Sequence, residues 1–233
     1  MAKVTDSQES ELSTAAPVAA APVAARILSP GKLYALVAAG LLLGLLAGWA
    51  LVRVSQGRPL FGPGEFHGLV IQSPPPLSNF ALTATNGEKM SLLDFRGKLV
   101  VLYFGYTYCP DVCPATMVEL KHMMEALGRD ARDVQVIMVS VDPDRDTPEK
   151  LGEYVTQFNP SFIGMTGNEN DLLGITTELG IFYQKHDGTP ATGYLIDHTA
   201  TVSVLDEDGR LRLVFPFGTT GEDMAADLRR LLP

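Results

Sequence analysis

Residues 98–114 read KLVVLYFGYTYCPDVCP, and they place two cysteines between a buried strand and a helix. Lys98 to Phe104 is a continuous β-branched and aromatic run, which is typical of a central strand buried on both faces. From Pro114 to Leu127 the apolar residues recur with a helical period. Cys109 and Cys113 therefore lie in a strand-to-helix loop, where the positive end of the helix dipole favours thiolates.

Two prolines define the start of this helix. Pro110 disfavours helical geometry at Cys109, and Pro114 does the same at Cys113. Because proline also suits the first helical position, Cys113 is predicted to be the N-cap residue.

Outward from the loop, the chain alternates between strands and helices as α/β domains do. Asn86-Gly87 predicts an early hairpin, and Thr147-Pro148 predicts the start of a helix. The other expected elements are a buried strand at 134–141, a helix at 168–179, strands at 201–205 and 211–215, and a helix from Thr220 to Leu231. This order predicts a thioredoxin-like α/β fold, with a central mixed sheet flanked by helices on both faces.

An uncharged stretch precedes this domain. Residues 33–52 lie between Lys32 and Arg53, and twenty helical residues span about 30 Å, the thickness of a hydrocarbon core. A cleavable signal peptide would have a shorter polar lead, and a core helix would show a polar stripe. We expect a disordered tail at 1–32, a transmembrane helix at 33–52, a Pro/Gly-rich linker at 53–76 and a folded domain at 77–233.

The net charge of −9 lies entirely in residues 53–233, which argues against a nucleic-acid partner. Arg26 and Lys32 on one side of the apolar stretch balance Arg53 and Arg58 on the other, so charge does not orient the chain. The N-terminal tail lacks the Arg-rich, acid-poor character of a mitochondrial presequence. A bacterial inner membrane is therefore the expected location.

Cys109 and Cys113 are the chain's two cysteines. Buried free cysteines are common in protein cores, but two core cysteines would rarely lie four residues apart across this loop. Thiol–disulfide exchangers generally have two residues between their cysteines, whereas three intervene here. The wider spacing lets both sulfurs converge on one soft ion, and it still allows a redox disulfide in an oxidising compartment.

The strand that should face the cysteines also departs from an exchanger. Exchangers carry a cis-proline there, followed by a Thr-x-Leu-Ile-Asp-x-x-Gly pattern. Aligning Leu205-Asp206 and Gly209 with that pattern puts Ala200 at the proline position. His198 lies two residues earlier, on a loop expected to face the cysteines, and it would complete a Cys₂His site. The other histidines, His67, His122 and His186, are expected to be surface or core residues. Met117, Met123 and Met124 have helical spacing and are expected to belong to a packed helix face.

Three motifs resemble the Sco/SenC family of copper chaperones: Tyr108–Pro114, Ser140–Thr147 and Asp197–Thr199. The resemblance covers about residues 75–233 and the single anchor. It implies that Cys109, Cys113 and His198 bind copper, as Cu(I) or Cu(II), taken from a copper donor protein. It further implies delivery to the dinuclear copper centre of cytochrome c oxidase subunit II, with the domain in the periplasm.

Two other functions remain open. A thiol–disulfide reductase would keep the oxidase cysteines reduced, and both roles can coexist in one protein. A peroxiredoxin-like peroxidase would need a threonine three residues before the reactive cysteine, whereas Thr107 lies two before Cys109.

The acidic run from Asp142 to Thr147 is also ambiguous. It predicts either a turn with a helix cap by Asp146, or a carboxylate of Asp142 or Asp144 that orients His198. Tyr106 and Tyr108 are expected to shield the site from water.

Overall fold

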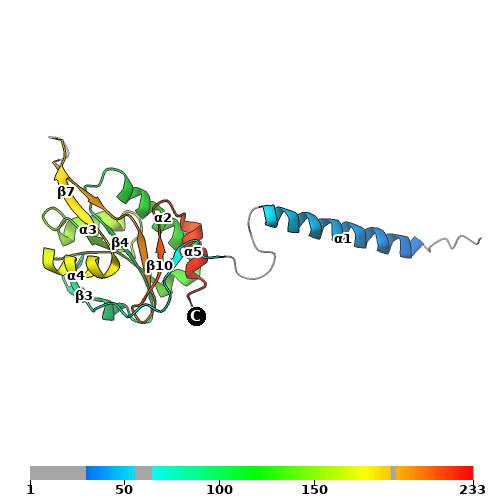
Figure 1. Ribbon diagram of the computed structural model, residues 1–233, viewed down its shortest axis with the longest axis horizontal. Helices are drawn as coiled ribbons and strands as arrows, with labels where there is room; N and C mark the ends of the chain where they lie inside the picture. The colour runs from blue at the N-terminus through cyan, green and yellow to red at the C-terminus, as the bar shows by residue number, and fades with distance from the viewer. Residues whose placement is uncertain (1–29, 56–64, 190–192, 233) are drawn as a thin grey trace, which may run out of the picture. The chain divides into compact units, whose positions relative to one another are not determined.

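The computed structural model describes residues 30–55, 65–189 and 193–232, and it divides the chain into two units, Met1–Gly64 and Glu65–Pro233 (Figure 1). In the first unit, α1 (Pro30–Ser55) is a single helix with no buried residue, long and apolar enough to cross a membrane. It contains the expected span at 33–52. Most of the expected tail, residues 1–29, and part of the expected linker, residues 56–64, lie outside the described residues.

The second unit is built on an eight-stranded mixed sheet, in the order β1-β10-β9-β4-β5-β6-β2-β3. At its centre, β4 (Leu99–Gly105) runs parallel to β5 (Val134–Ser140) and antiparallel to β9 (Val202–Leu205). Every residue of β4 and β5 is buried, as their uninterrupted apolar sequences predict. The remaining strands are β1 (Leu69–Val70), β2 (Ala81–Ala84), β3 (Lys89–Ser91), β6 (Ile163–Thr166) and β10 (Leu211–Phe215).

Helices flank this sheet, so the predicted thioredoxin-like class is confirmed. They are α2 (Val112–Leu127), α3 (Pro148–Thr156), α4 (Glu169–Leu179) and α5 (Gly221–Leu228), with short 3₁₀ helices η1 (Leu92–Phe95) and η2 (Gly128–Asp133). α2 packs against α5, and a Cβ at Gly221 would lie 2.5 Å from the Glu119 carbonyl oxygen, so the close approach requires a glycine. Thr147 and Thr220 cap α3 and α5, because their hydroxyls accept hydrogen bonds from the backbone amides of Lys150 and Asp223.

A second, two-stranded sheet was not predicted. It is a hairpin of β7 (Tyr183–Asp187) and β8 (Tyr194–His198), and β7 extends to the outer end of the unit in Figure 1. β7 could not be recognised from its sequence, because Gln184 to Asp187 are polar and form no alternating apolar face; all four are exposed. The short strands β1 and β6 were missed as well, since two- and four-residue segments carry too little pattern.

Two predicted helix boundaries were wrong. α2 begins at Val112 with Asp111 as its N-cap, so Cys113 is the second helical residue. Pro114 is tolerated there because amide groups throughout the first turn have no intrahelical partner. α5 ends at Leu228, before the predicted Leu231.

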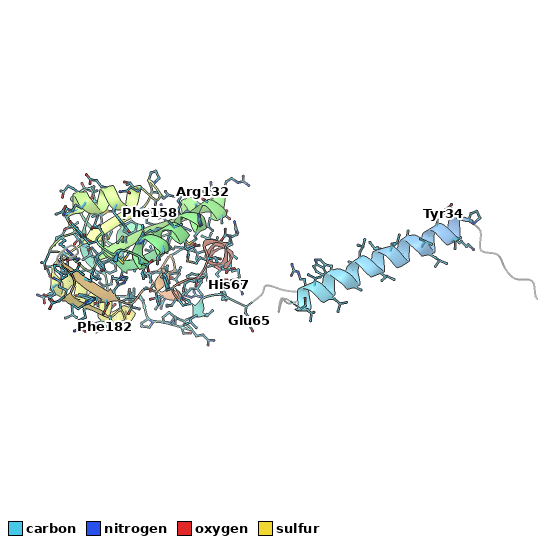
Figure 2. The ribbon with its side chains drawn as sticks, turned by 90° about the horizontal axis from the view of Figure 1, so that it is seen from above. Tyr34, Glu65, His67, Arg132, Phe158 and Phe182 are labelled. Atoms are coloured by element: carbon cyan, nitrogen blue, oxygen red, sulfur yellow. The ribbon has the colours of Figure 1, made fainter. Side chains whose placement is uncertain are left out.

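The second unit also includes residues 65–76, which were expected to be linker. β1 pairs antiparallel with β10, and the backbone amides of His67 and Gly68 donate to the buried carboxylate of Asp227 at 2.7 and 2.9 Å. His67 lies near the start of this unit (Figure 2). This stretch is therefore joined to the sheet edge and to α5.

Candidate metal centre

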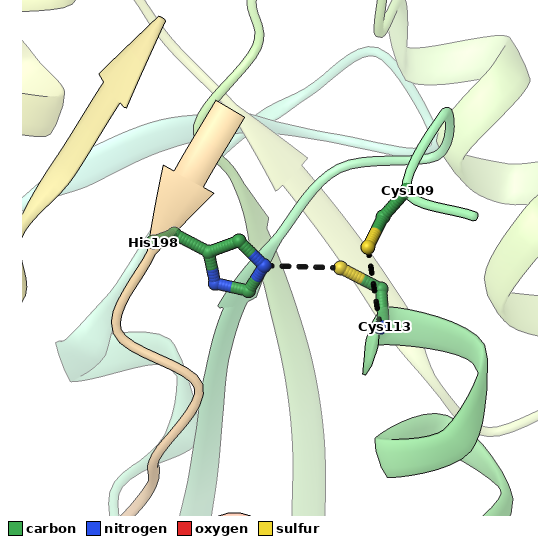
Figure 3. Close-up of side chains that lie close together, drawn as sticks. All are labelled: Cys109, Cys113 and His198. Carbon is green, nitrogen blue, oxygen red and sulfur yellow. Dashed lines mark hydrogen bonds between the residues drawn. The ribbon is translucent and has the colours of Figure 1, made fainter. Parts of the chain in front are cut away.

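The two cysteines lie in the loop between β4 and α2. Cys113 is completely buried in the first turn of α2, whereas Cys109 is partly exposed in the loop. The Cys113 backbone amide donates to the Cys109 sulfur at 3.4 Å (Figure 3). Neither cysteine is in a disulfide, and the amide contact places Cys109 at the positive end of the helix dipole.

Gly105, the last residue of β4, makes room for the buried sulfur. A Cβ at this position would lie 2.9 Å from Cys113 Sγ and 2.9 Å from a ring carbon of Tyr103. Both distances are shorter than van der Waals contact, so a larger residue would push the sulfur or the ring aside. The core itself thus sets the position of Cys113.

His198 reaches the cysteines from the other side of the loop (Figure 3). It is the last residue of β8, not part of a loop as predicted, and its Nε2 lies 3.3 Å from Cys113 Sγ. Its Nδ1 lies 3.3 Å from the Thr199 carbonyl oxygen. In the tautomer with the proton on Nδ1, this nitrogen would donate to the carbonyl, and Nε2 of the neutral ring would have its lone pair free for a metal.

The ligand atoms of Cys109, Cys113 and His198 all lie within 4.8 Å of one another. Sulfur and nitrogen ligands typically stand about 2.3 and 2.0 Å from a zinc-sized ion, so this spread is close to what one ion needs. Two sulfurs and an imidazole suit a soft or borderline metal such as copper or zinc. The three residues that the sequence singled out can therefore share a metal ion.

The two thiols have very different acidities. The pKa of Cys109 is lowered to about 3, mainly by a hydrogen bond from Cys113 and to a smaller extent by one from His198. Burial acts in the opposite direction. Sharing its proton with Cys109, together with burial, raises the pKa of Cys113. The metal-free site therefore holds one thiolate and one thiol, and metal binding would release the remaining proton.

Two tyrosines flank the imidazole. The rings of Tyr103 and Tyr106, both buried, stand edge-on to the His198 ring with centroids 6.1 and 6.0 Å away. Tyr106 thus covers the site as expected, but Tyr108 is largely exposed. Tyr103 was not predicted, although the strand alternation offered a signal, because it points to the same face as Gly105.

The acidic run serves a different purpose from the one predicted. Asp142 contacts Arg145 and Tyr194, and Asp144 pairs with Lys185, so neither carboxylate orients His198 directly. The reason is that His198 Nδ1 already has a backbone acceptor.

Asp146 does not cap α3 either. Its buried carboxylate accepts hydrogen bonds from Ser140 Oγ at 2.6 Å and from the amide and hydroxyl of Thr107 at 3.0 and 2.6 Å. It therefore ties the cysteine loop to the end of β5. Thr147 alone provides the cap that was assigned to Asp146.

The remaining histidines stay apart from this cluster. His67 contacts Asp227 and Asp223, and His122 lies 3.8 Å from Glu119 on α2. His186 is an exposed residue of β7, as expected, and pairs with Asp197 across the hairpin. Met117 and Met123 are fully buried core residues, as expected.

Comparison with known proteins gives a consistent result. The family model described as SCO1/SenC matches residues 72–233. The SCO2-like protein RP587 of Rickettsia prowazekii is 35% identical over 172 residues, which are 73% of this chain and 82% of the relative.

Solved structures match the same part of the chain. Bradyrhizobium japonicum ScoI with copper bound is 37% identical, with a TM-score of 0.62 over 68% of this chain and 100% of that one. Apo Sco1 from Thermus thermophilus is 41% identical, with a TM-score of 0.64 over 72% and 98%.

Proposed function

The chain belongs to the SCO1/SenC family, and on this premise we propose that it is a membrane-anchored copper chaperone for cytochrome c oxidase subunit II. The family comprises copper-binding proteins of cytochrome c oxidase assembly. In the proposal, Cys109, Cys113 and His198 bind one copper ion, which is passed to the dinuclear copper centre of that subunit. The observation that carries it is the convergence of these three ligand atoms within 4.8 Å.

The donor set fits copper in either oxidation state. Two thiolates favour Cu(I), and an imidazole adds the nitrogen that Cu(II) prefers. Cys109 is already a thiolate, so only the Cys113 proton must leave when copper enters. Cys113 is fully buried, whereas Cys109 and His198 are partly exposed. A metal ligand of the acceptor protein would therefore approach the ion from the side of Cys109 and His198. Cys113 would then be the last donor to release the ion.

The surface around the site suits a protein acceptor. Among the described residues of the second unit, the exposed aromatic side chains are Tyr108, Phe182 and Phe217, and each adjoins the site. Tyr108 precedes Cys109, and Phe182, at the surface in Figure 2, exchanges two hydrogen bonds with Thr199 beside His198. Phe217 lines a surface cavity together with Thr116 and Ala200. Exposed apolar side chains gathered in this way favour a protein interface.

A second role, as a thiol–disulfide reductase, is supported by the asymmetry of the cysteines. The partly exposed Cys109 thiolate can attack a substrate disulfide and form a mixed disulfide, releasing one substrate thiolate. Deprotonated Cys113 would then attack the Cys109 sulfur, closing a Cys109–Cys113 disulfide and freeing the second substrate thiol. A peroxidase is less well supported, because the Thr107 hydroxyl donates to Asp146 and not toward a cysteine.

The anchor and the family support the proposed location. α1 fits a membrane-spanning helix, and we place it in a bacterial inner membrane with the copper-binding domain in the periplasm. In this arrangement residues 33–52 form the span, with a tail before it and a linker after it. A copper donor protein would load the site from the periplasmic side.

The test compares ligand variants of the full chain in cells that depend on it for oxidase. His198→Ala and Cys113→Ala should both lower the copper content and activity of the oxidase, with His122→Ala as a control. Added copper should partly rescue His198→Ala, because two thiolates can still hold Cu(I). Normal oxidase with His198→Ala but none with Cys113→Ala would replace the chaperone role with the reductase role.

A further inference from the structure

We propose that Arg145 is a positioning residue that holds His198 at the cysteines by joining the β7–β8 hairpin to the cysteine loop. The inference rests on the proposed function, since it takes Cys109, Cys113 and His198 as the copper ligands. Arg145 lies outside this set. It acts through the placement of the third donor and does not bind the ion.

Backbone pairing does not fix His198 relative to the cysteines. Among the described strands, β8 pairs with β7 and not with the main sheet that leads to Cys109 and Cys113. The two halves of the site therefore belong to two separate sheets. The chain rejoins the main sheet at Val202 of β9, four residues after His198, where it pairs with Tyr103 of β4. The intervening residues do not fix the direction of the imidazole, so side-chain contacts help to set the distance between His198 Nε2 and Cys113 Sγ.

Arg145 makes the most extensive set of these contacts. Its Nε donates to Asp142 Oδ2 at 2.5 Å, and its Nη1 donates to the Tyr194 carbonyl oxygen in β8 at 3.0 Å. The Tyr194 hydroxyl donates back to Asp142 Oδ1 at 2.5 Å. Asp142 is fully buried and the Arg145 side chain is 17% exposed, so water competes little for these bonds.

The guanidinium also stacks on both halves of the site. Its central carbon lies 3.7 Å from the ring centroid of Tyr194 and 4.7 Å from that of Tyr108. Tyr108 directly precedes Cys109, and Tyr194 is in the strand that ends at His198. A planar, forked cation can stack on two rings while it donates hydrogen bonds at its edge, which the ammonium of lysine cannot do.

Other contacts hold the hairpin less firmly. Lys185 pairs with Asp144, but both side chains are largely exposed, and such pairs contribute little. The Ile196 amide donates a single hydrogen bond to the Tyr106 hydroxyl at 3.2 Å. Loss of the Arg145 contacts should therefore let His198 move away while the two cysteines stay in place.

The experiment uses Arg145→Lys in the full chain in detergent, with copper as the probe. Cu(II) affinity should fall about tenfold or more, the usual cost of losing a residue that orients a ligand. The nitrogen coupling in the Cu(II) EPR spectrum should weaken. Cu(I) affinity should change much less, because the dithiol half is intact, and it also reports that the protein is folded.

Two comparisons make the result specific. In a His198→Ala background, Arg145→Lys should change Cu(II) affinity less than about twofold, since residues that act through one another are not additive. Arg212→Lys is the matched control, because Arg212 pairs with Asp206 at 3.2 Å beside the β9–β10 turn. It should leave Cu(II) affinity unchanged.

A full Arg145→Lys effect in the His198→Ala background would overturn the inference, and so would an effect no larger than that of Arg212→Lys. Both results leave the proposed ligands intact. If His198→Ala alone binds Cu(II) as wild type does, the ligand set fails and the inference fails with it. Should Arg145→Lys not retain stoichiometric Cu(I), the same cycle is run with Tyr194→Phe, which removes one bond of the network and is read by the same criteria.

Discussion

The two halves of the proposed metal centre differ in how they are attached to the protein. The cysteine loop begins at β4, which is hydrogen-bonded to strands on both sides and completely buried. The histidine ends a hairpin whose outer strand is exposed from Gln184 to Asp187. Segments with few buried apolar contacts open at lower free energy than core strands. The dithiol half should therefore be rigid and the imidazole half adjustable.

The largest effect that tests this contrast is on copper retention. Cys113→Ser should lower the affinity for both Cu(I) and Cu(II) by more than about 100-fold. The loss of a metal ligand costs more affinity than the loss of a residue that only orients a ligand. His198→Ala should lower Cu(II) affinity comparably but Cu(I) affinity much less. Competition with chelators specific for each oxidation state measures both. Equal losses of Cu(I) in the two variants would show that the halves are not distinct.

Thiol reactivity against pH sharpens the contrast within the cysteine loop. The pKa of Cys109 is lowered to about 3, so its thiolate predominates at every pH above that value. An ordinary thiol, with a pKa near 8.5, is less than about 0.1% ionised at pH 5. Alkylation of reduced, copper-free protein at pH 5 should thus modify Cys109 at a rate within about tenfold of that at pH 8.

Cys113 provides the internal comparison for this measurement. Its pKa is raised and its side chain is buried, so it should stay unmodified until the protein unfolds. Mass spectrometry of the labelled protein distinguishes the two sites. Labelling of both cysteines at similar rates would contradict the assigned asymmetry.

The smallest effect concerns the hairpin alone. Tyr106→Phe removes the hydroxyl that accepts from the Ile196 amide, which should cost about 1 kcal/mol of unfolding free energy. Hydrogen exchange should become faster at β8 amides and stay unchanged in β4. Tyr154→Phe is a suitable control, since the buried Tyr154 hydroxyl has no hydrogen-bond partner among the described residues. Equal acceleration in β4 and β8 would mean that the hairpin does not open independently.

The core half of the site was the predictable half. A continuous apolar run, a proline near the helix start and a helical apolar period all act locally, so they predicted β4, the loop and α2 to within a few residues. The missing proline at Ala200 drew attention to His198, and the structure has no cis peptide among its described residues. The details that failed, such as the cap at Asp111, depend on single backbone angles.

The hairpin half was not predictable in the same way. A polar, exposed strand such as β7 has no core-facing pattern, so the β7–β8 hairpin was not recognised. His198, the last residue of β8, was therefore expected on a loop. Arg145 gave no signal either, because its role depends on contacts with Tyr108 and Tyr194, 37 and 49 positions away in the chain. The acidic run invited a direct link to His198, whereas the link that exists passes through Asp142, Arg145 and the hairpin backbone.

The pairing of β1 with β10 determines where this protein can be shortened. A fragment that begins at Glu65 keeps β1 and the three hydrogen bonds from His67 and Gly68 to Asp227. A fragment that begins at residue 72, where the family match starts, uncovers the edge of β10 and leaves a buried carboxylate without those donors. An open edge strand is a template for pairing with another copy of the chain. The seven residues from Glu65 to Ile71 thus protect the domain from aggregation, although they lie outside the matched family region.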